Sequence, residues 1–527
     1  MSEFNLIDEA WIPVRKLDGE RVELGIRDTL LKAKEIAVIE DPSPLVTAAL
    51  YRFLLAVLYR ALNGPTDIDQ ARAWFKSGLP ADKIDAYLEC WRERFWLFDQ
   101  QYPFFQIPDF EPKVWRAWTV LAAEHNADNA KVLFDHVDVT RAGSISPSAA
   151  ARWLLAAQTF AFTGNSEFGY SSFSPSVNAA MVIPLGNNLE DTLMLCLVDQ
   201  NRDALKGDKP LWEMEPISVQ HLEKGVPRSL MGHAQLYTWA SRAIRLRNAG
   251  DGVAHVAFAA GIRVIDACGD AQKDKTKDGK KNKKAVSFTD PMAAYHVDKE
   301  SGKQVRRFSE RGLWRDFDSL LPDGADLAPA VIEHATALTR SDRTRFPRSV
   351  MVLGQSNNKA KIEFWRLERF ALPEALLGDR SIRTEIHQLL TDAETNQQAL
   401  WRACKSFARD LLSRGERTPD AKDISRFVDQ MPVSAAYWST LEAAFHDVLR
   451  HYTAESDPDA IRLAWLKTVR SILRDAWQRH AASVATSDAW AIRALVRAEP
   501  HVNRQISALN KEIQQYETYR QTQEETA

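Results

Sequence analysis

The sequence predicts an α+β fold in which a large mixed α/β N-terminal domain, residues 1–372, is followed by a C-terminal four-helix bundle, residues 373–527. At 527 residues the chain is too long for one compact core. Before Pro373, short extended and helical stretches alternate with segments rich in Gly, Ser and Asn. Beyond Pro373, apolar residues recur at helical spacing over long stretches. We therefore expect two domains of different architecture.

The N-terminal domain begins with an expected edge strand and turn from Phe4 to Val14, where β-forming residues surround Pro13. A helix is expected next, at about Pro44 to Leu62, because its apolar residues repeat at helical spacing. This stretch is of marginal length for a membrane span, and Arg52 and Arg60 interrupt it. We expect a buried core helix and no membrane partner.

Three segments of this domain are expected to be loops. Two of them, Thr163–Asn178 and Gly186–Asn188, are rich in Gly, Ser and Asn. The third, Lys273 to Lys284, holds seven lysines, two aspartates and no apolar residue, so it cannot bury itself. We expect this lysine run to be a mobile surface loop.

The C-terminal domain shows four amphipathic stripes, each typical of a helix that packs against partner helices. They run through Ile386–Leu411, Leu441–Tyr452, Ile461–Trp477 and Trp490–Tyr519. The third is preceded by Asp457, which can cap a helix, and Pro458, which suits a first turn. Pro500 interrupts the fourth, so we expect that helix to be kinked or split there.

Composition restricts the possible functions. The net charge is only −3, so any contact with nucleic acid must come from local basic patches. The four cysteines lie far apart, which indicates neither a disulfide framework nor a thiolate zinc site. The N-terminus has an acidic residue where a secretion signal carries basic ones, which predicts a cytoplasmic protein.

No common catalytic motif is present. The sequence lacks a phosphate-binding G-x-x-x-x-G-K-[ST] loop, an H-E-x-x-H helix, a G-x-S-x-G elbow and a G-x-G-x-x-G turn. The adjacent pair Asp135-His136 could serve a general base or a metal site, but such a pair is far more often a structural hydrogen bond. We predict a protein that is not an enzyme and has no cofactor and no metal site.

Basic loops are the remaining candidates for function. Arginines recur from Arg340 to Arg348, and an amide-rich segment ending in lysines follows from Gly354 to Lys361. Such side chains can neutralise phosphates, reach minor-groove acceptors or insert at a base step. An ordinary polar turn with solvated charges has the same composition and is the commoner case. For the lysine run, the commoner case is a solvated, flexible insert. Composition leaves both readings open.

Five segments, in order, resemble the CasA family, the large subunit of the type I-E CRISPR Cascade surveillance complex. They are Phe4–Val14, with Ala10 where proline is usual, Tyr102–Gln106, Asn129–His136, Tyr237–Leu246 and Gly354–Lys361. The resemblance covers most of the first 370 residues, and the terminal helices match the family's four-helix bundle in kind. Each segment alone is a weak signal, whereas five in order are a specific one.

The resemblance implies three DNA-binding loops. The wedge loop, which pushes between base pairs, corresponds to Asn357, Asn358, Lys359, Ala360 and Lys361, with Lys359 in place of the usual glutamine. The minor-groove loop corresponds to Asn178, Ala179 and Ala180, where alanines replace two glycines. The lysine loop contributes one contact from Lys281, Lys283 or Lys284.

The resemblance also implies a docking loop for the 5′ end of the guide RNA and a neighbouring subunit. Its residues are Asn129, Phe134 and His136, with Phe134 as an exposed anchor. Some relatives bind zinc through cysteines ahead of the lysine region, but Cys268 stands alone in this chain, so no zinc is expected.

The function implied is a non-catalytic subunit that recognises the protospacer-adjacent motif in double-stranded target DNA. It would help open the duplex for R-loop formation and help recruit the CRISPR helicase-nuclease. The alternatives are an assembly scaffold without DNA readout and an unrecognised nucleic-acid-processing enzyme. The sequence leaves open the preferred motif, the helicase-docking surface and how tightly the subunit is held in its complex.

Overall fold

The computed structural model describes most of the chain. The described residues are 3–122, 143–160, 167–248, 250, 252–265, 288–298, 302–307, 312–322, 327–358, 361–378, 381–415, 418–484 and 487–526. They form two compact units. Unit 1 comprises Met1–Leu313 and Ser319–Phe370, and unit 2 comprises Trp314–Asp318 and Ala371–Ala527.

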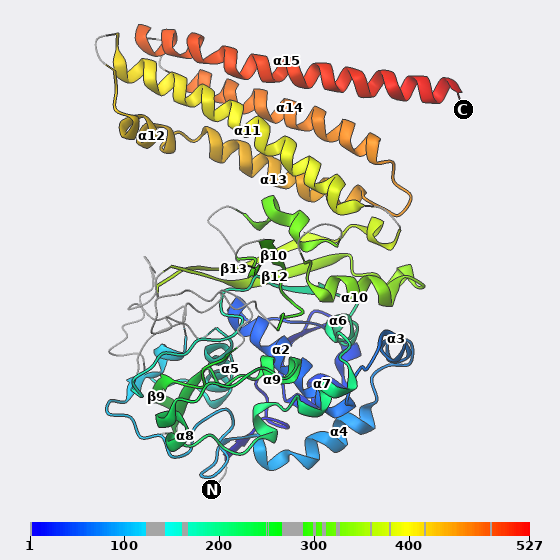
Figure 1. Cartoon of the computed structure of the whole chain (residues 1–527), viewed down its shortest axis with the longest axis vertical. Helices are drawn as coiled ribbons and strands as arrows, with labels where there is room; N and C mark the ends of the chain where they lie inside the picture. The colour runs from blue at the N-terminus through cyan, green and yellow to red at the C-terminus, as the bar shows by residue number, and fades with distance from the viewer. Residues whose placement is uncertain are drawn as a thin grey trace. The chain divides into compact units, whose positions relative to one another are not determined.

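Unit 1 contains ten helices among its described residues, in addition to short 3-10 turns. They are α1 (Ile26–Leu31), α2 (Pro44–Leu62), α3 (Ile68–Ser77), α4 (Ala81–Cys90), α5 (Pro147–Thr159), α6 (Leu189–Cys196), α7 (Arg202–Gly207), α8 (Val219–Lys224), α9 (His233–Tyr237) and α10 (Ala330–Thr339). Helix α2 lies at the centre of this unit, with α5, α6 and α9 around it (Figure 1).

Helix α2 has the bounds expected from the sequence. The Ser43 side chain accepts a hydrogen bond from the Val46 N–H, Pro44 occupies the first turn, and Asn63 ends the helix in the left-handed conformation. Among the described residues it is the one helix long and apolar enough to cross a membrane, yet nearly all of its side chains are buried inside unit 1. The expected core helix is confirmed.

The strands of unit 1 form small antiparallel sheets. They are β1 (Glu3–Asn5), β2 (Ile12–Lys16), β3 (Arg21–Leu24), β4 (Ile36–Ile39), β5 (Trp96–Phe98), β6 (Arg116–Ala117), β7 (Met181–Leu185), β8 (Arg242–Asn248), β9 (Val253–Ala260), β10 (Tyr295–Asp298), β11 (Gly302–Val305), β12 (Ser349–Asn358) and β13 (Lys361–Ala371). The sheet orders are β1-β5, β3-β2-β4, β6-β9-β8, β10-β11 and β13-β12-β7.

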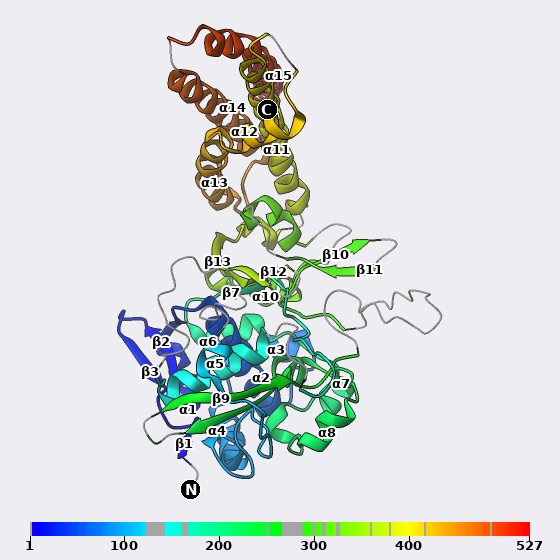
Figure 2. The same cartoon turned by 90° about the vertical axis from the view of Figure 1, so that its left-hand side faces the viewer.

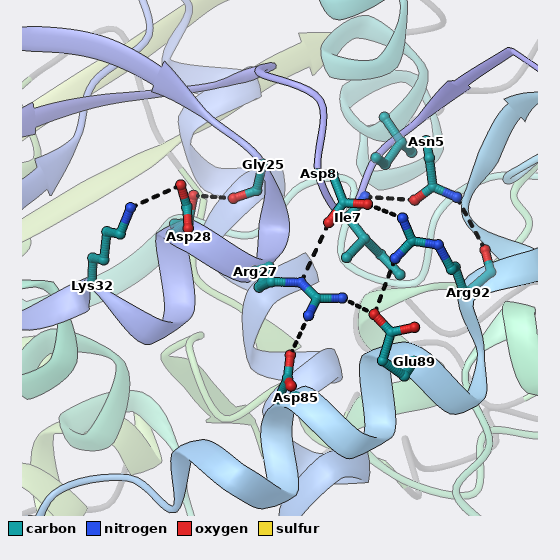
Figure 3. A network of polar contacts seen from close by, with 12 residues as sticks. Asn5, Ile7, Asp8, Gly25, Arg27, Asp28, Lys32, Asp85, Glu89 and Arg92 are labelled. Carbon is teal, nitrogen blue, oxygen red and sulfur yellow. Dashed lines mark hydrogen bonds and ion pairs between the residues drawn. The ribbon is translucent and has the colours of Figure 1, made fainter.

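The opening segment Phe4–Val14 has a structural role. Figure 3 shows Asn5 accepting the Ile7 N–H at 3.0 Å and donating to the Arg92 carbonyl at 3.2 Å. Asp8 pairs with Arg27 of α1 at 3.3 Å and also with Arg92, and Arg27 pairs in turn with Asp85 of α4 at 2.6 Å. Each exposed ion pair adds little, but a shared network fixes how these segments cross. The opening segment therefore connects α1 with the turn that contains Arg92.

Unit 2 is a helical bundle, drawn in yellow to red in Figure 1. Its helices are α11 (Ile382–Ser413), α12 (Ala421–Asp429), α13 (Val433–His451), α14 (Pro458–Ser483) and α15 (Ala489–Thr526). The four long helices bury most of the stripes expected from the sequence, although Trp490 and Tyr519 at the ends of the fourth stripe are exposed. Helix α12 is an additional short helix against α11. An α+β fold with a C-terminal run of packed long helices is thus confirmed.

Of the two expectations for the helix at Pro500, the split is wrong and the kink stays a prediction. Helix α15 is not split at Pro500 but continues through it from Ala489 to Thr526. Proline has no N–H to donate to the carbonyl of Val496, four residues earlier. Val496 is 61% exposed, so this turn of the helix faces solvent. A proline at a solvent-facing turn is therefore compatible with a continuous helix.

Candidate nucleic-acid interface

The predicted wedge loop lies at the connection of a β-hairpin. Strand β12 pairs with β7 from Ser349↔Leu185 to Leu353↔Met181 and then continues to Asn358, and β13 begins at Lys361. The segment from Gly354 to Asn358, expected as a loop, is therefore strand. Lys359 and Ala360 lie outside the described residues, as do the side chains of Asn357, Asn358 and Lys361.

The hairpin extends beyond the strand that supports it. Asn358 lies five residues past Leu353, the last residue paired with β7. At a rise of about 3.3 Å per residue, this end of the hairpin reaches roughly 17 Å beyond the ladder. Figure 2 shows β12 and β13 beside β7 in unit 1. A strand pair of this length can carry its connection well beyond the body of the sheet.

The predicted minor-groove loop enters β7 at the same end of the sheet. Ala179 and Ala180 are 0% and 1% exposed, and their N–H groups donate to the carbonyls of Ser176 and Arg306 at 3.0 and 3.2 Å. Asn178 is half-buried. Of the three predicted residues, only Asn178 therefore has surface available in this conformation, and the minor-groove contact stays a prediction.

Two buried anchors hold this loop. Gln355 of β12 is fully buried, and its side-chain amide donates to the Phe160 carbonyl at 3.1 Å and the Val177 carbonyl at 3.5 Å. The Ser172 hydroxyl donates to the Ser241 carbonyl at 2.6 Å and accepts the Gly261 N–H at 2.8 Å. Buried polar groups that are paired in this way rigidify the backbone around them. The minor-groove loop is therefore held firmly within unit 1.

Arg242 also supports the minor-groove loop, through Ser172. Its guanidinium donates to the Ser172 carbonyl at 2.9 Å, and burial lowers its pKa to about 10. The side chain is 2% exposed. Gly261 lies beside it, where a Cβ atom would stand 2.4 Å from the Ala240 carbonyl oxygen, so a side chain there would collide with backbone. Arg242 thus acts in packing, although it belongs to one of the segments that carry the family resemblance.

A third anchor joins the loop to the end of the lysine loop. Lys281, Lys283 and Lys284 lie outside the described residues, but the chain is described again from Phe288. Ser176 donates to the carboxylate of Asp290 at 2.6 Å, and the Val182 N–H donates to the Met292 carbonyl at 2.8 Å. The segment that leaves the lysine loop therefore lies beside the start of β7.

The predicted docking loop lies outside the described residues, between Ala122 and Gly143. Asn129, Phe134 and His136 all fall in residues 123–142. Leu121 and Ala122 before the gap are buried, and after it Ile145 pairs with Val253 of β9. The roles of the three docking residues stay predictions.

In the arginine run from Arg340 to Arg348, one side chain makes contacts within unit 1 and three are exposed. Arg345 packs its guanidinium over the Phe75 ring at 3.5 Å and pairs with Asp191. Its role is to connect elements within unit 1, which favours the structural reading of this residue. Arg340, Arg343 and Arg348 are exposed.

Sequence reasoning missed the two buried residues that organise this region, Gln355 and Asp290. The available signal was Arg52, a charge inside an otherwise apolar helix, because a buried charge needs a partner. The sequence could not identify that partner. Among the described residues, no three His, Cys, Asp or Glu side chains are placed to hold a metal ion. Cys268 and the pair Asp135-His136 lie outside them.

Comparison with known proteins gives consistent matches over nearly the whole chain. The family described as CRISPR-associated protein Cse1 matches residues 5–476. The chain is 32% identical over 526 residues to CRISPR-associated protein CasA/Cse1 of Thermus thermophilus, and the match covers 97% of this chain and 99% of that protein.

Solved structures agree with the sequence match. The structure of Thermus thermophilus CasA (Cse1) is similar with a TM-score of 0.81 at 31% identity, covering 96% of this chain and 100% of that one. A chain of a CRISPR RNA-guided surveillance complex is similar with a TM-score of 0.66 at 19% identity, over 96% of this chain and 99% of that one. The second likeness is one of fold alone.

Proposed function

This chain belongs to the CRISPR-associated Cse1 (CasA) family, the large subunits of type I-E Cascade, and on that premise we propose that it recognises the protospacer-adjacent motif in duplex DNA. It acts as a non-catalytic subunit of an RNA-guided surveillance complex. It helps to open the duplex for R-loop formation and to recruit the helicase-nuclease.

One observation carries this proposal: segments flanking all three predicted DNA-binding loops meet at one end of the β13-β12-β7 sheet. The minor-groove loop enters β7 there, and the β12-β13 hairpin extends past the same end. The chain leaving the lysine loop bonds to both the minor-groove loop and β7, through Asp290 to Ser176 and through Met292 to Val182. Three loops with these starting points can act on one short stretch of duplex.

The mechanism divides the work among these loops. Lysines of the lysine loop attract backbone phosphates, and this attraction carries no sequence information. The minor groove offers a degenerate pattern of donors and acceptors, so readout there tolerates several motifs. The hairpin connection at Lys359 acts as the wedge. Each base-pair step that it opens sacrifices about 1.4 kcal/mol of stacking, which guide pairing then restores.

The partners follow from the same proposal. The similar chain of known fold is part of a CRISPR RNA-guided surveillance complex. We infer that this chain likewise assembles with guide RNA and other Cascade subunits. Asn129, Phe134 and His136 make the contact with the 5′ end of the guide and the neighbouring subunit.

The wedge assignment is tested by Lys359→Ala in the assembled complex. R-loop formation on linear duplex should slow by about fivefold to tenfold, the effect of about 1 to 1.4 kcal/mol at the opening step. Assembly with guide RNA should be unchanged. Stopped-flow fluorescence of a base analogue placed beside the motif measures the opening rate.

The matched control is Lys83→Ala, an exposed lysine on α4, which Figure 1 shows at the far end of unit 1 from β12. It should open duplex at the wild-type rate. If the two variants open duplex equally fast, Lys359 does not act as the wedge.

A further inference from the structure

Arg52 carries a charge in the middle of the apolar helix α2. Its side chain is 2% exposed, and its Nη1 lies 2.6 Å from Oδ2 of Asp290, whose side chain is 0% exposed. The guanidinium also lies over the Tyr237 ring at 4.3 Å. Removing both charges from water costs much of the free energy that their attraction gains. An apolar pair at these positions would therefore stabilise the core about equally. What the ion pair adds is a directed connection between particular segments.

Asp290 makes that connection through both of its carboxylate oxygens and its backbone N–H. Its Oδ2 accepts from Ser176 at 2.6 Å as well as from Arg52, and its Oδ1 accepts the Met292 N–H at 2.9 Å. Its own N–H donates to the Tyr295 hydroxyl at 2.7 Å. One carboxylate thus links α2, the minor-groove loop and the segment that leaves the lysine loop.

The linked positions are close in sequence to the predicted DNA contacts. Ser176 precedes Asn178 by two residues, which is about 7 Å of extended chain. Asp290 follows Lys284 by six residues, about 20 Å at full extension. Helix α2 provides a rigid reference for both, because it is buried along its length. Asp290 is therefore connected by contiguous contacts to the minor-groove loop and to the described segment that follows the lysine loop.

We propose that Asp290 is a positioning residue that holds the minor-groove loop and the described segment that follows the lysine loop, from Phe288 on, in one arrangement on α2. This inference rests on the proposed function and adds the residue on which motif discrimination depends. Asp290 itself is buried and touches no DNA. It acts through Ser176 on the minor-groove loop and through its own backbone on the segment that begins at Phe288.

Two variants test the proposal. Asp290→Asn keeps the size of the side chain but leaves Arg52 without its counter-ion. Ser176→Ala removes the hydrogen bonds that join the minor-groove loop to Asp290 at 2.6 Å and to Arg52 at 3.3 Å, and it keeps the ion pair, so it tests this connection even where Asp290→Asn does not fold. The assembled complex is given a library of linear duplexes that share one target and are randomised beside it. Sequencing of the R-loop fraction over time gives the ratio between the fastest and slowest flanking sequences.

The matched control is Glu213→Gln, which breaks another ion pair of helix α2. Arg60 of α2 contacts Glu213 at 2.7 Å, and their side chains are 17% and 5% exposed. Like Asp290→Asn, this variant should lower the melting temperature. We expect Asp290→Asn and Ser176→Ala to reduce the discrimination ratio at least tenfold, while Glu213→Gln keeps the ratio within twofold of wild type.

Comparing the melting temperature with the discrimination ratio distinguishes a positioning role from a purely structural one. Wild-type discrimination in both Asp290→Asn and Ser176→Ala, with melting lowered as in the control, would overturn the inference and leave the proposed function intact. A wild-type complex that opens every flanking sequence at one rate would overturn the proposed function and the inference together.

Discussion

His334 predicts a pH dependence of stability whose size can be worked out from its surroundings. It lies on α10 with 4% of its surface exposed, and its Nε2 is 3.2 Å from the Met194 carbonyl oxygen. That contact requires a proton on Nε2, so Nδ1 is the unprotonated nitrogen of a neutral ring. Burial lowers the pKa of His334 to about 4, although Asp199, 3.9 Å from Nδ1, opposes the shift.

The direction follows from comparing the folded and unfolded states. The unfolded ring takes up a proton as the pH falls below about 6.5, whereas the folded ring stays neutral until about pH 4. The contribution of neutral His334 to the free energy of unfolding is therefore fully present above pH 6.5, and it is lost as the pH falls toward 4. A shift of this size gives a loss of about 1 kcal/mol at pH 6, about 2 kcal/mol at pH 5 and about 3 kcal/mol below pH 4.

The test is His334→Gln, whose amide can still donate to the Met194 carbonyl but does not titrate. Urea unfolding of wild type and variant at pH 7.5, 6 and 5 gives the difference in unfolding free energy at each pH. Because every other titrating group is shared, wild type should lose about 2 kcal/mol more than the variant between pH 7.5 and 5. A difference that stays constant with pH would show that His334 is not held neutral by the fold.

Two further predictions concern the loops of the candidate interface. Replacing Lys281, Lys283 and Lys284 with alanine should make the slope of log K against log salt less steep by about 0.9 for each lysine that contacts a phosphate, and an unaltered slope in duplex-binding titrations would exclude such contacts. Gln355→Met should lower stability by about 1–3 kcal/mol, because it leaves a buried carbonyl without its donor. Thermal melting measures this loss, and an unchanged melting temperature would mean that water or a shifted backbone replaces the amide.

Features that depend on neighbouring residues could be predicted from the sequence. The bounds of α2 follow from Ser43, Pro44 and Asn63, each of which acts on backbone within a few residues of itself. The apolar stripes of the bundle follow from helical spacing in the same way. The order of five short segments was enough to indicate the family, which the comparisons confirm.

Only the tertiary structure brings Ser176, Asp290 and Gln355 together. These residues are separated by 65 or more positions in the chain, and their pairing depends on how β7, β12 and the segment after the lysine loop pack on α2. The burial of Ala179 and Ala180 has the same origin, because an alanine has no sequence signal that separates a packed position from one at a DNA surface. Local spacing determines which segments form helices and strands, whereas packing between distant segments determines which polar side chains meet.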